Sequence, residues 1–241
     1  MRIAILSDIH ANAIALEAVL EDINSRHIDL VFCSGDLVGF GAYPNEVINL
    51  IRKNRIPTIM GNYDDAVGFN KPDSGGGLFI DPHMKELGQV SLEWTKKQVN
   101  FENRSFLRSL LERIQFSACG KKVLIVHGSP RQISEHLYAD LPEEPVLSFF
   151  DSEKVDIIIC GHTHLPYTRV MDTKCLINAG SVGKPKDGDQ RAAYTVVKLT
   201  EASIETEVIR VKYDVERMAQ AIEASGLPGE FAMGLRNGMS G

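Results

Sequence analysis

The chain has 241 residues, 44% of them hydrophobic and 24% charged, so it is long enough to bury a sizeable core and its composition argues against wholesale disorder. Its formal net charge of −6 disfavours charge-driven wrapping of duplex nucleic acid, although a bound metal ion can still supply positive charge for a phosphate ligand. No segment reaches the ~20 apolar residues of a membrane span, and the N-terminal apolar run is shorter than a signal peptide, so we expect a cytoplasmic protein.

The first third of the chain predicts alternating strands and helices. Strands are expected over residues 3–6, 29–34 and 56–60, and helices over residues 13–24, capped by Asn12, and from Pro44 onward. The three strands end on Ser7-Asp8-Ile9-His10, on Gly35-Asp36 and on Gly61-Asn62-Tyr63-Asp64. The spacing from one strand end to the next is about one βαβ unit, so parallel strands would bring Asp8, Asp36 and Asn62 to one edge of a sheet.

Residues 66–113 have a different character. The segment 66–82 is rich in Gly and Pro and predicts a mobile loop, and helices are expected over residues 83–98 and 101–113. We interpret this stretch as a helical insert, a lid or flank over the strand edge, within a single domain of residues 1–241. Trp94 is expected to be a packing anchor. The basic residues of the insert are expected to form a solvated helical face and not a nucleic-acid track: Lys96, Lys97, Arg104 and Arg108.

The second half of the chain predicts mostly strands. They are expected over residues 115–118, 122–126, 155–160, 167–171, 175–178, 191–199 and 204–211, with helices over 143–150 and 215–224 and a frayed Gly-rich tail. The four cysteines show no C-x-x-C spacing, and we expect buried, reduced thiols at Cys33, Cys119, Cys160 and Cys175.

Two of these later strands also end on histidines, in His127-Gly128 and Gly161-His162-Thr163-His164. Together the strand ends carry seven groups with lone pairs to donate: Asp8, His10, Asp36, Asn62, His127, His162 and His164. Two carboxylates, an amide oxygen and four imidazoles exceed the needs of one tetrahedral ion, which favours two adjacent metal ions that share a carboxylate. Oxygen and nitrogen ligands without thiolate suit Mn, Fe, Zn, Ni or Co, and we favour Mn or Fe. Such a pair makes hydroxide available at neutral pH and predicts hydrolysis of a phosphate ester.

The five motifs closely resemble those of the calcineurin-like metallophosphoesterase superfamily, in the same order and over residues 1–183. The resemblance implies an α/β fold in which a two-sheet β-sandwich is flanked by helices, a four-layer αββα arrangement. It implies that one divalent metal ion is bound by Asp8, His10, Asp36 and His164. The other ion would be bound by Asp36, Asn62, His127 and His162, so that Asp36 bridges the two.

The motif Gly61-Asn62-Tyr63-Asp64 departs from the usual pattern of the family, which has a histidine at the position of Tyr63 to protonate the leaving group. A phenol is a poorer general acid than an imidazole at neutral pH, so esters with good leaving groups suffer least. We therefore predict a phosphodiesterase or a dinucleoside-polyphosphate hydrolase that uses hydroxide bridging two metal ions, with Asn62, Tyr63 and Asp64 as catalytic residues. Asp64 or His83 could replace Tyr63 as the acid. The alternatives are a phosphomonoesterase or protein phosphatase, and a non-catalytic metal-binding scaffold.

The expected partner is a small phosphoester or nucleotide, with neither a membrane nor nucleic acid as ligand. Asn12, Arg131 and Ser181 are predicted to contact the substrate, Ser181 from the loop Asn178-Ala179-Gly180-Ser181-Val182-Gly183. Arg191 is a further candidate for phosphate binding, because a guanidinium can bind phosphate in a bidentate manner. The oligomeric state is not predicted by any pattern in the sequence.

Overall fold

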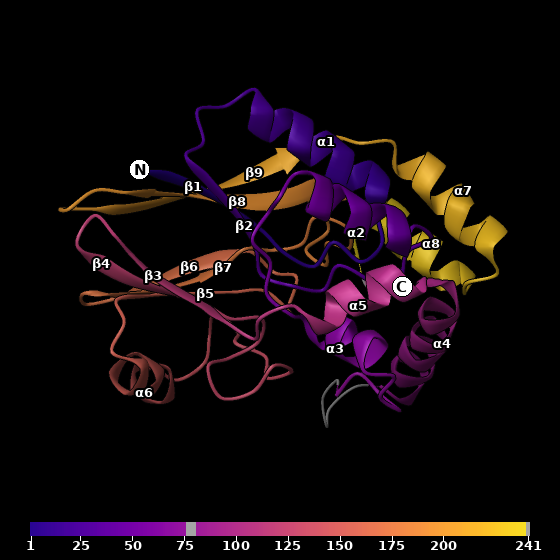
Figure 1. Ribbon diagram of the computed structural model, residues 1–241. Coiled ribbons are helices and arrows are strands. Elements are labelled where there is room, and N and C mark those ends of the chain that lie inside the picture. Colours follow the sequence, from indigo (N-terminus) through magenta and orange to yellow (C-terminus); the bar gives the residue numbers. More distant parts are fainter. Residues whose placement is uncertain (76–80, 240–241) are drawn as a thin grey trace.

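Figure 1 shows the computed structural model, which describes residues 1–75 and 81–239 as two β-sheets packed between layers of helices. The first sheet has the order β2 (Leu30–Cys33), β1 (Arg2–Leu6), β8 (Ala192–Leu199) and β9 (Ile204–Val211). The second has the order β3 (Ile114–Ala118), β4 (Lys121–Ile125), β5 (Ile157–Cys160), β7 (Lys174–Asn178) and β6 (Tyr167–Met171). The two-sheet sandwich implied by the family resemblance is therefore confirmed.

Helices cover the outer faces of the two sheets. Their bounds are α1 (Ala13–Asn24), α2 (Pro44–Lys53), α3 (Asn62–Gly68), α4 (Pro82–Gln98), α5 (Phe101–Arg108), α6 (Glu143–Glu153), α7 (Val215–Ser225) and α8 (Gly229–Asn237). Helices α1 and α2 pack on the first sheet, and α6 packs on the second. Among the described residues, no helix combines the length and the hydropathy needed to span a lipid bilayer.

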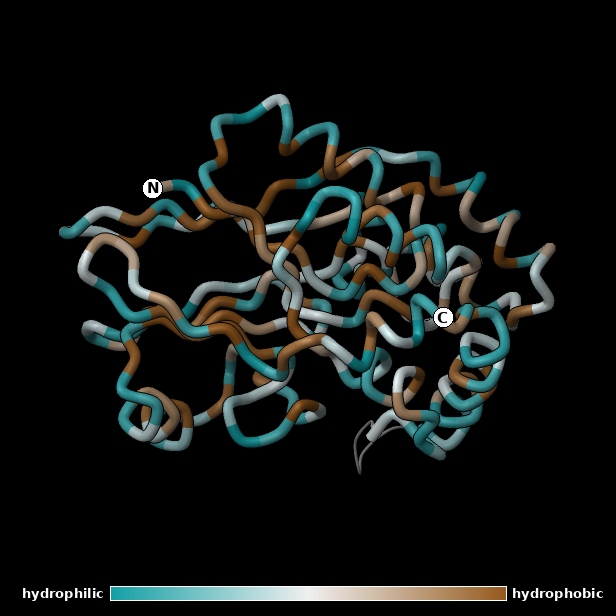
Figure 2. The backbone as a smooth tube through the Cα atoms, viewed as in Figure 1, coloured by the Kyte–Doolittle hydropathy of each residue, from teal (hydrophilic) through white to brown (hydrophobic). Residues whose placement is uncertain are grey.

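The alternation of side chains along each strand explains the layers. Ile3 and Ile5 of β1 lie in the buried cluster between the sheets, together with Ile157 and Ile159 of β5. Leu6, on the opposite face of β1, belongs to the cluster beneath α1 and α2. Figure 2 shows hydrophobic stretches along the central strands and hydrophilic ones on the outer helices and loops. Burial of both faces of the central strands thus stabilises the sandwich.

Parallel pairing brings the polar strand ends to one end of the sandwich. Strand β1 pairs in parallel with β2, and β4 and β7 both pair in parallel with β5. Hydrogen bonds continue beyond the strands, from Asp8 N to the Gly35 carbonyl at 3.0 Å and from Gly161 N to the His127 carbonyl at 2.9 Å. The loops that follow these strands are therefore held at fixed relative positions.

Residues 56–60 do not form the predicted third strand. They make only isolated bridges, Cys33 to Thr58 and Ile59 to Leu111. Pro57 lacks an N–H group, so this segment cannot form a full ladder along β2. The chain still follows the edge of β2, because the Pro57 carbonyl accepts from Cys33 N and Ile59 N donates to the Cys33 carbonyl, both at 3.0 Å. Its end therefore lies beside the end of β2 as predicted.

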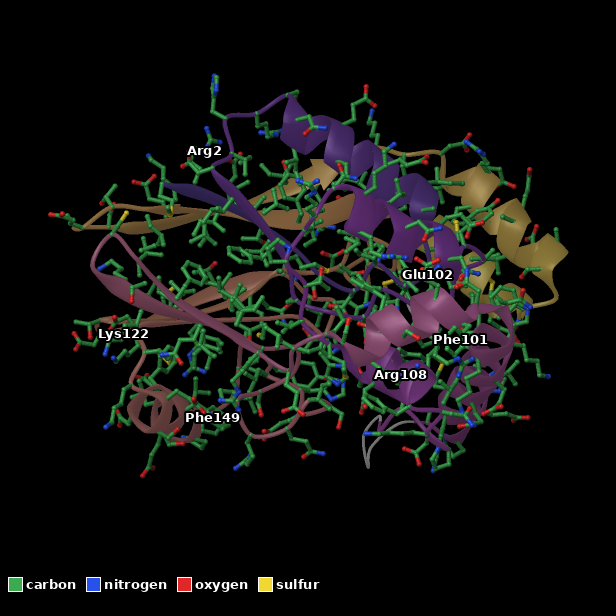
Figure 3. The ribbon with its side chains drawn as sticks, in the orientation of Figure 1. Arg2, Phe101, Glu102, Arg108, Lys122 and Phe149 are labelled. Atoms are coloured by element: carbon green, nitrogen blue, oxygen red, sulfur yellow. The ribbon has the colours of Figure 1, made fainter. Side chains whose placement is uncertain are left out.

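The insert differs from prediction in three respects. Helix α3 begins at Asn62 and occupies the first residues of the predicted loop 66–82, of which residues 76–80 lie outside the described part. Helix α5 ends at Arg108, before residue 113, because the following chain bridges back to Ile59. The basic residues are not simply solvated: Arg104 donates to the Val67 carbonyl at 3.0 Å, and Arg108, labelled in Figure 3, reaches the last turn of α3. The prediction for Trp94 is confirmed, since it packs against the buried cluster of α7 and α8, where its Nε1 also donates to the Ser225 carbonyl at 3.1 Å.

The expectation of a frayed tail is wrong for residues 229–237. These residues form α8, and Phe231 and Leu235 are buried against α7 and α4. Gly238 ends the helix in the left-handed conformation that glycine adopts readily. Of the four cysteines, three are buried free thiols as predicted, whereas Cys119 is only half-buried.

Candidate metal centre

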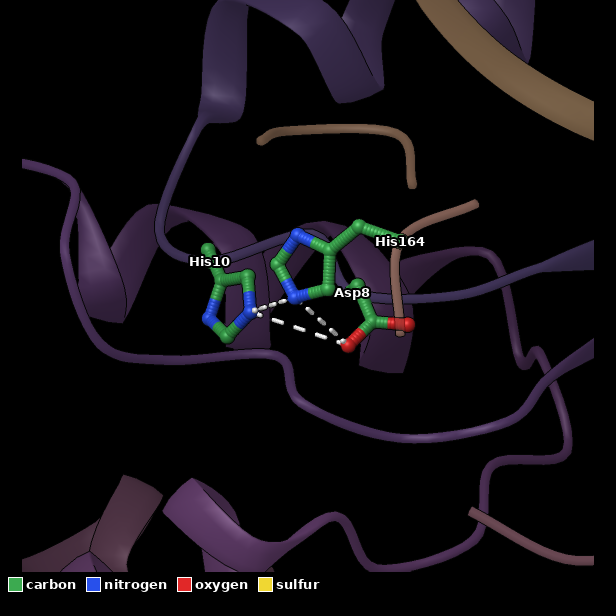
Figure 4. Close-up of side chains that lie close together, drawn as sticks. All are labelled: Asp8, His10 and His164. Atoms are coloured by element: carbon green, nitrogen blue, oxygen red, sulfur yellow. Dashed lines mark hydrogen bonds and ion pairs between the residues drawn. The ribbon is translucent and has the colours of Figure 1, made fainter. Parts of the chain in front are cut away.

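The seven predicted side chains meet at one end of the sandwich, in two groups that draw on both sheets. The first group consists of Asp8 and His10, from the loop after β1, and His164, from the loop after β5 (Figure 4). The second group consists of Asp36, from the loop after β2, with His127 and His162, which follow β4 and β5. Within each group the ligand atoms lie within 4.8 Å of one another, and all six side chains are buried.

Asp36 lies between the two groups. Its Oδ2 is 3.7 Å from Nε2 of His10 and 3.4 Å from Nε2 of His127, whereas its Oδ1 accepts from Tyr63 N at 2.8 Å. Asn62 joins the second group, because its Oδ1 lies 3.0 Å from His127 Nε2 while its Nδ2 donates to the Ser74 carbonyl. One oxygen of Asp36 thus faces both groups.

Backbone carbonyls orient all four imidazoles. Nδ1 of His10 lies 3.0 Å from the Val38 carbonyl and Nδ1 of His127 lies 2.8 Å from the Ser34 carbonyl. The other two rings meet carbonyls in the same way, His164 through Nδ1 at Lys184 and His162 through Nε2 at Ser134. A carbonyl only accepts, so each ring donates an N–H there and directs its other nitrogen, the one that could ligate a metal ion, to the interior of the site.

In the first group three lone-pair atoms face one another, and a bound cation would remove the repulsion between them. The Nε2 atoms of His10 and His164 lie 3.1 Å apart, and Oδ1 of Asp8 is 3.2 Å from His164 Nε2 and 3.7 Å from His10 Nε2. In the neutral rings the Nε2 atoms of His10 and His164 both carry lone pairs, because Nδ1 of each ring donates to a carbonyl. Asp8 Oδ1 is buried without a hydrogen-bond donor among the described residues. Separations of this size are those between neighbouring donors about 2.1 Å from one metal ion. The first group therefore fits a divalent cation.

Five of the seven side chains are attached to backbone in the left-handed region. The φ angles are 50° at Asp8, 46° at His10, 55° at Asp36, 66° at His162 and 64° at His164. A non-glycine residue in this region costs roughly 1 kcal/mol, and such strain concentrates at functional sites. The loops after the strands therefore turn sharply, which aims the side chains inward.

Comparison with known proteins agrees with this geometry. Residues 1–202 match the Calcineurin-like phosphoesterase superfamily domain. The chain belongs to this superfamily. An uncharacterized protein of Methanocaldococcus jannaschii, MJ0912, is 36% identical over 94% of this chain and 93% of its own length. A metallophosphoesterase from Sphaerobacter thermophilus is 30% identical with a TM-score of 0.75, over 99% of both chains. The hypothetical protein PH1004 from Pyrococcus horikoshii OT3, 23% identical over 100% of this chain and 99% of its own, shares the fold with a TM-score of 0.85.

The charges of this metallophosphoesterase site are strongly coupled. Burial disfavours the charge on Asp8, yet attraction to His164 and the other histidines outweighs burial and lowers the pKa of Asp8 well below its ordinary value. Burial lowers the pKa of His164 to about 4 and lowers that of His10 as well. At His127 burial is outweighed by Asp36, which raises the pKa to about 9. His10 and His164 are thus neutral and ready to ligate, whereas the negative charge of Asp36 favours a proton on His127, which a bound metal ion would replace.

Asp64 ties together the loops that carry Asp36 and Asn62. Its Oδ1 accepts from Leu37 N at 2.9 Å and from Val38 N at 3.3 Å, and its Oδ2 accepts from Gly61 N at 3.0 Å. Burial and the charge of Asp36 raise the pKa of Asp64 to about 7. Both oxygens of this predicted acid are therefore occupied by backbone N–H groups.

Tyr63 is buried beside the site and contacts both the first group and the insert. Its ring packs on Gly39 and meets the ring of His10 edge-on, with 5.7 Å between the centroids. A Cβ atom at Gly88 of α4 would lie 3.1 Å from the Tyr63 hydroxyl, so this hydroxyl abuts the insert. Burial raises the pKa of Tyr63 above its ordinary value.

The predicted substrate contacts are mostly engaged elsewhere. Asn12 caps α1 through Oδ1 and donates from Nδ2 to the Gly183 carbonyl at 3.0 Å. Ser181 donates to the Asp8 carbonyl at 2.7 Å. Arg131 pairs with Glu135 on the surface. Arg191 pairs with Asp189, and exposed His83 lies 3.9 Å from Glu230. Asn12 and Ser181 therefore hold the loops of the site in place.

Three polar residues near the site were not singled out from the sequence. His136 lies over His162, with 4.2 Å between the ring centroids, and is half-buried. Lys184 is buried, with Nζ 4.5 Å from the centroid of the Phe40 ring, and Lys186 follows it in the same loop. Burial lowers the pKa of both lysines. Neither lysine follows an apolar run directly, so the pattern that indicates the ligands does not include them.

Proposed function

We propose that this protein is a metal-dependent phosphodiesterase or dinucleoside-polyphosphate hydrolase that acts on small substrates. The convergence of three lone pairs, from Asp8, His10 and His164, on one buried point carries the proposal. Lone pairs that converge with no proton between them are arranged to bind a cation. The superfamily to which the chain belongs consists of phosphoesterases.

We assign one divalent ion to Asp8, His10, Asp36 and His164, and the other to Asp36, Asn62, His127 and His162. Mn or Fe is the favoured metal. Ions held there would supply activated hydroxide at neutral pH as the nucleophile and would neutralise charge on the phosphoryl oxygens. The carbonyl partners of the imidazoles keep each ring in the tautomer that ligates. Asn62 presents Oδ1 because its amide nitrogen is held by Ser74.

The surroundings of Tyr63 and Asp64 favour diesters and anhydrides as substrates, because the leaving groups of these compounds need no proton. The hydroxyl of Tyr63 abuts α4, its pKa is raised, and both oxygens of Asp64 bind backbone N–H groups. Neither side chain is placed to give a proton readily. A leaving group of low pKa departs without one, as in an aryl diester or a phosphoanhydride.

The proposal is tested with metal analysis and two model substrates. Protein loaded in turn with Mn²⁺, Fe²⁺ and Zn²⁺ is assayed on bis-p-nitrophenyl phosphate and p-nitrophenyl phosphate. Asp36→Asn is assayed beside the control Asp65→Asn, at a half-buried carboxylate that pairs with Lys71. We expect two ions per chain, faster diester than monoester hydrolysis, and loss of both ions and turnover in Asp36→Asn alone. Faster monoester hydrolysis would instead support a phosphomonoesterase or protein phosphatase. Two bound ions without turnover of any ester would support a metal-binding scaffold.

A further inference from the structure

Among the seven candidate ligands, His162 is the one most open to solvent. This residue is 8% exposed, whereas each of the other six is at most 3% exposed. A substrate therefore approaches the metal centre most easily on the side of His162. Two aromatic residues that the proposed function does not use, His136 and Tyr138, lie on that side.

His136 and Tyr138 continue a row of aromatic rings that begins in the second group. The ring centroids of His127 and His162 are 5.0 Å apart, and those of His162 and His136 are 4.2 Å apart. The rings of His136 and Tyr138 are nearly parallel, with 5.5 Å between the centroids and 7° between the planes. Exposure rises along the row, because His136 is half-buried and Tyr138 is 42% exposed. The row therefore leads from the metal centre to the surface.

The loop that carries these two rings is fixed from beneath. Leu137, which separates them in the sequence, is buried in the cluster under α6, and its carbonyl accepts from the Tyr167 hydroxyl at 2.7 Å. Nearer the start of the loop, the carbonyl of Ser134 accepts from Nε2 of His162 at 3.1 Å. The rings are thus held in place before a ligand arrives, which lowers the entropy that binding costs.

Aromatic rings beside a centre for phosphate match the two parts of a nucleotide, a phosphate and a flat base joined by a ribose. Proteins bind unpaired bases by stacking them on histidine and tyrosine rings. Such stacking accepts any base, because every base has a flat π face. With its phosphate at the metal ions, a nucleotide would extend its base outward past His162, which is the direction that the aromatic row takes.

We infer that His136 and Tyr138 bind the base of a nucleotide substrate by stacking, so that the enzyme prefers nucleotide esters over phosphoesters that lack a base. The inference rests on the proposed function, of which it specifies the organic group attached to the phosphate. It applies to nucleoside diesters and to dinucleoside polyphosphates alike, because both carry bases.

The test compares adenosine 5′-monophosphate with ribose 5-phosphate, which has the same phosphate and sugar but no base. Binding to protein loaded with Mn²⁺ is measured by calorimetry, with phosphate release followed in parallel. The variants are Tyr138→Leu, which removes the ring, Tyr138→Phe, which keeps it, and the control Phe101→Leu, at an aromatic residue 82% exposed on α5.

Wild-type protein should bind adenosine 5′-monophosphate about tenfold more tightly than ribose 5-phosphate. Tyr138→Leu should lose most of this preference, while its affinity for ribose 5-phosphate stays within about twofold of wild type. Tyr138→Phe and Phe101→Leu should keep the preference, because the first retains the ring and the second lies on another element. Equal affinity of wild type for the two ligands, or an unchanged preference in Tyr138→Leu, would overturn the inference.

His136→Leu is the second site variant, and its metal content is measured by elemental analysis because His136 contacts His162. At the metal content of wild type, it should bind adenosine 5′-monophosphate about fivefold more weakly and ribose 5-phosphate as wild type does. An equal loss for both ligands would overturn the role of His136 in base binding, because the residue would then act through the phosphate site. If metal is lost, the two Tyr138 variants decide the inference.

Failure of the inference and failure of the proposed function give different results. Protein that hydrolyses bis-p-nitrophenyl phosphate but binds the two test ligands equally would keep the proposed function and refute the inference. Protein that prefers adenosine 5′-monophosphate through Tyr138, yet hydrolyses neither bis-p-nitrophenyl phosphate nor diadenosine tetraphosphate, would keep the base site and refute the proposed function.

Discussion

Replacing Asp64 with asparagine separates a positioning role from an acid role at the same residue. The carboxylate accepts three backbone N–H groups, from Leu37, Val38 and Gly61, and thereby joins the loops that carry Asp36 and Asn62. An amide keeps one acceptor oxygen and turns a donor toward the N–H groups on the other side. If Asp64 positions these loops, Asp64→Asn must lower both stability and metal affinity.

The magnitude follows from the hydrogen bonds that are lost. A hydrogen bond to a charged group contributes about 1.5–3 kcal/mol, and a buried N–H left without an acceptor adds to the cost. We expect the free energy of unfolding to fall by about 3 kcal/mol and metal binding to weaken by about tenfold or more. Urea denaturation of chelated protein, at a pH above the raised pKa of Asp64 so that the carboxylate is charged, measures the first effect. Calorimetric titration with Mn²⁺ measures the second.

Asp65→Asn is the matched control, one residue along the same helix. Asp65 forms an ion pair with Lys71, whose side chain is 50% exposed, so its loss should cost below about 1 kcal/mol. The positioning role is refuted if the free energy of unfolding of Asp64→Asn lies within about 0.5 kcal/mol of wild type and metal binding is normal while turnover is abolished. Asp64 would then be the acid.

Three further changes have defined outcomes. Gly61→Ala should abolish binding of one metal ion, because the added Cβ would lie 2.1 Å from Oδ1 of Asp36. The control Gly229→Ala, with nothing within 4 Å of its Cβ, should still bind two ions, as measured by elemental analysis. Equal metal content in the two variants would contradict this prediction. The hydrogen bond from Arg191 lowers the pKa of Asp189 to about 2, so this carboxylate stabilises the fold above its unfolded pKa of about 3.9 and ceases to do so as the pH falls through about 2. In urea titrations Asp189→Asn should cost below about 1 kcal/mol at pH 7, since the pair is partly exposed, and nothing near pH 2; a pH-independent cost would refute the assignment. Tyr63→His should raise p-nitrophenyl phosphate hydrolysis and change bis-p-nitrophenyl phosphate hydrolysis little; unchanged monoester rates would show that Tyr63 does not restrict the leaving group.

The convergence of the seven predicted ligands could be foreseen because each of them follows an apolar run. An apolar run that stops on Asp8, Asp36 or His127 marks the end of a buried strand. Parallel pairing then brings these strand ends to one edge of each sheet. The two-sheet sandwich is implied only by the family resemblance, because the apolar runs do not show how the strands divide between two sheets. The turn geometry could not be predicted. Asp8 and His162 have positive φ angles, but the residue that usually marks this conformation in a sequence is glycine.

The errors have equally local causes. Residues 56–60 are apolar, but Pro57 interrupts the ladder, so tertiary contact replaces strand pairing. The tail has the spacing of an amphipathic helix, Phe231 and Leu235, yet its glycines suggested disorder. Lys184 contacts His164 and Phe40 from the loop after β7. The pairing of β7 beside β5 that brings this loop there is a long-range arrangement with no local signal.

The origin of the ligands in both sheets has a mechanical consequence. Asp8 and His10 extend from the first sheet and His164 from the second, so a cation between them would be a cross-link across a layer otherwise joined by apolar side chains, which resist shearing weakly. Removal of the metal ions would allow this end of the molecule to open locally more often. Amide hydrogens near the ends of β1 and β5 would then exchange faster in step with one another, while those at the β3–β4 turn, at the far end of the same sheet, would keep their rates.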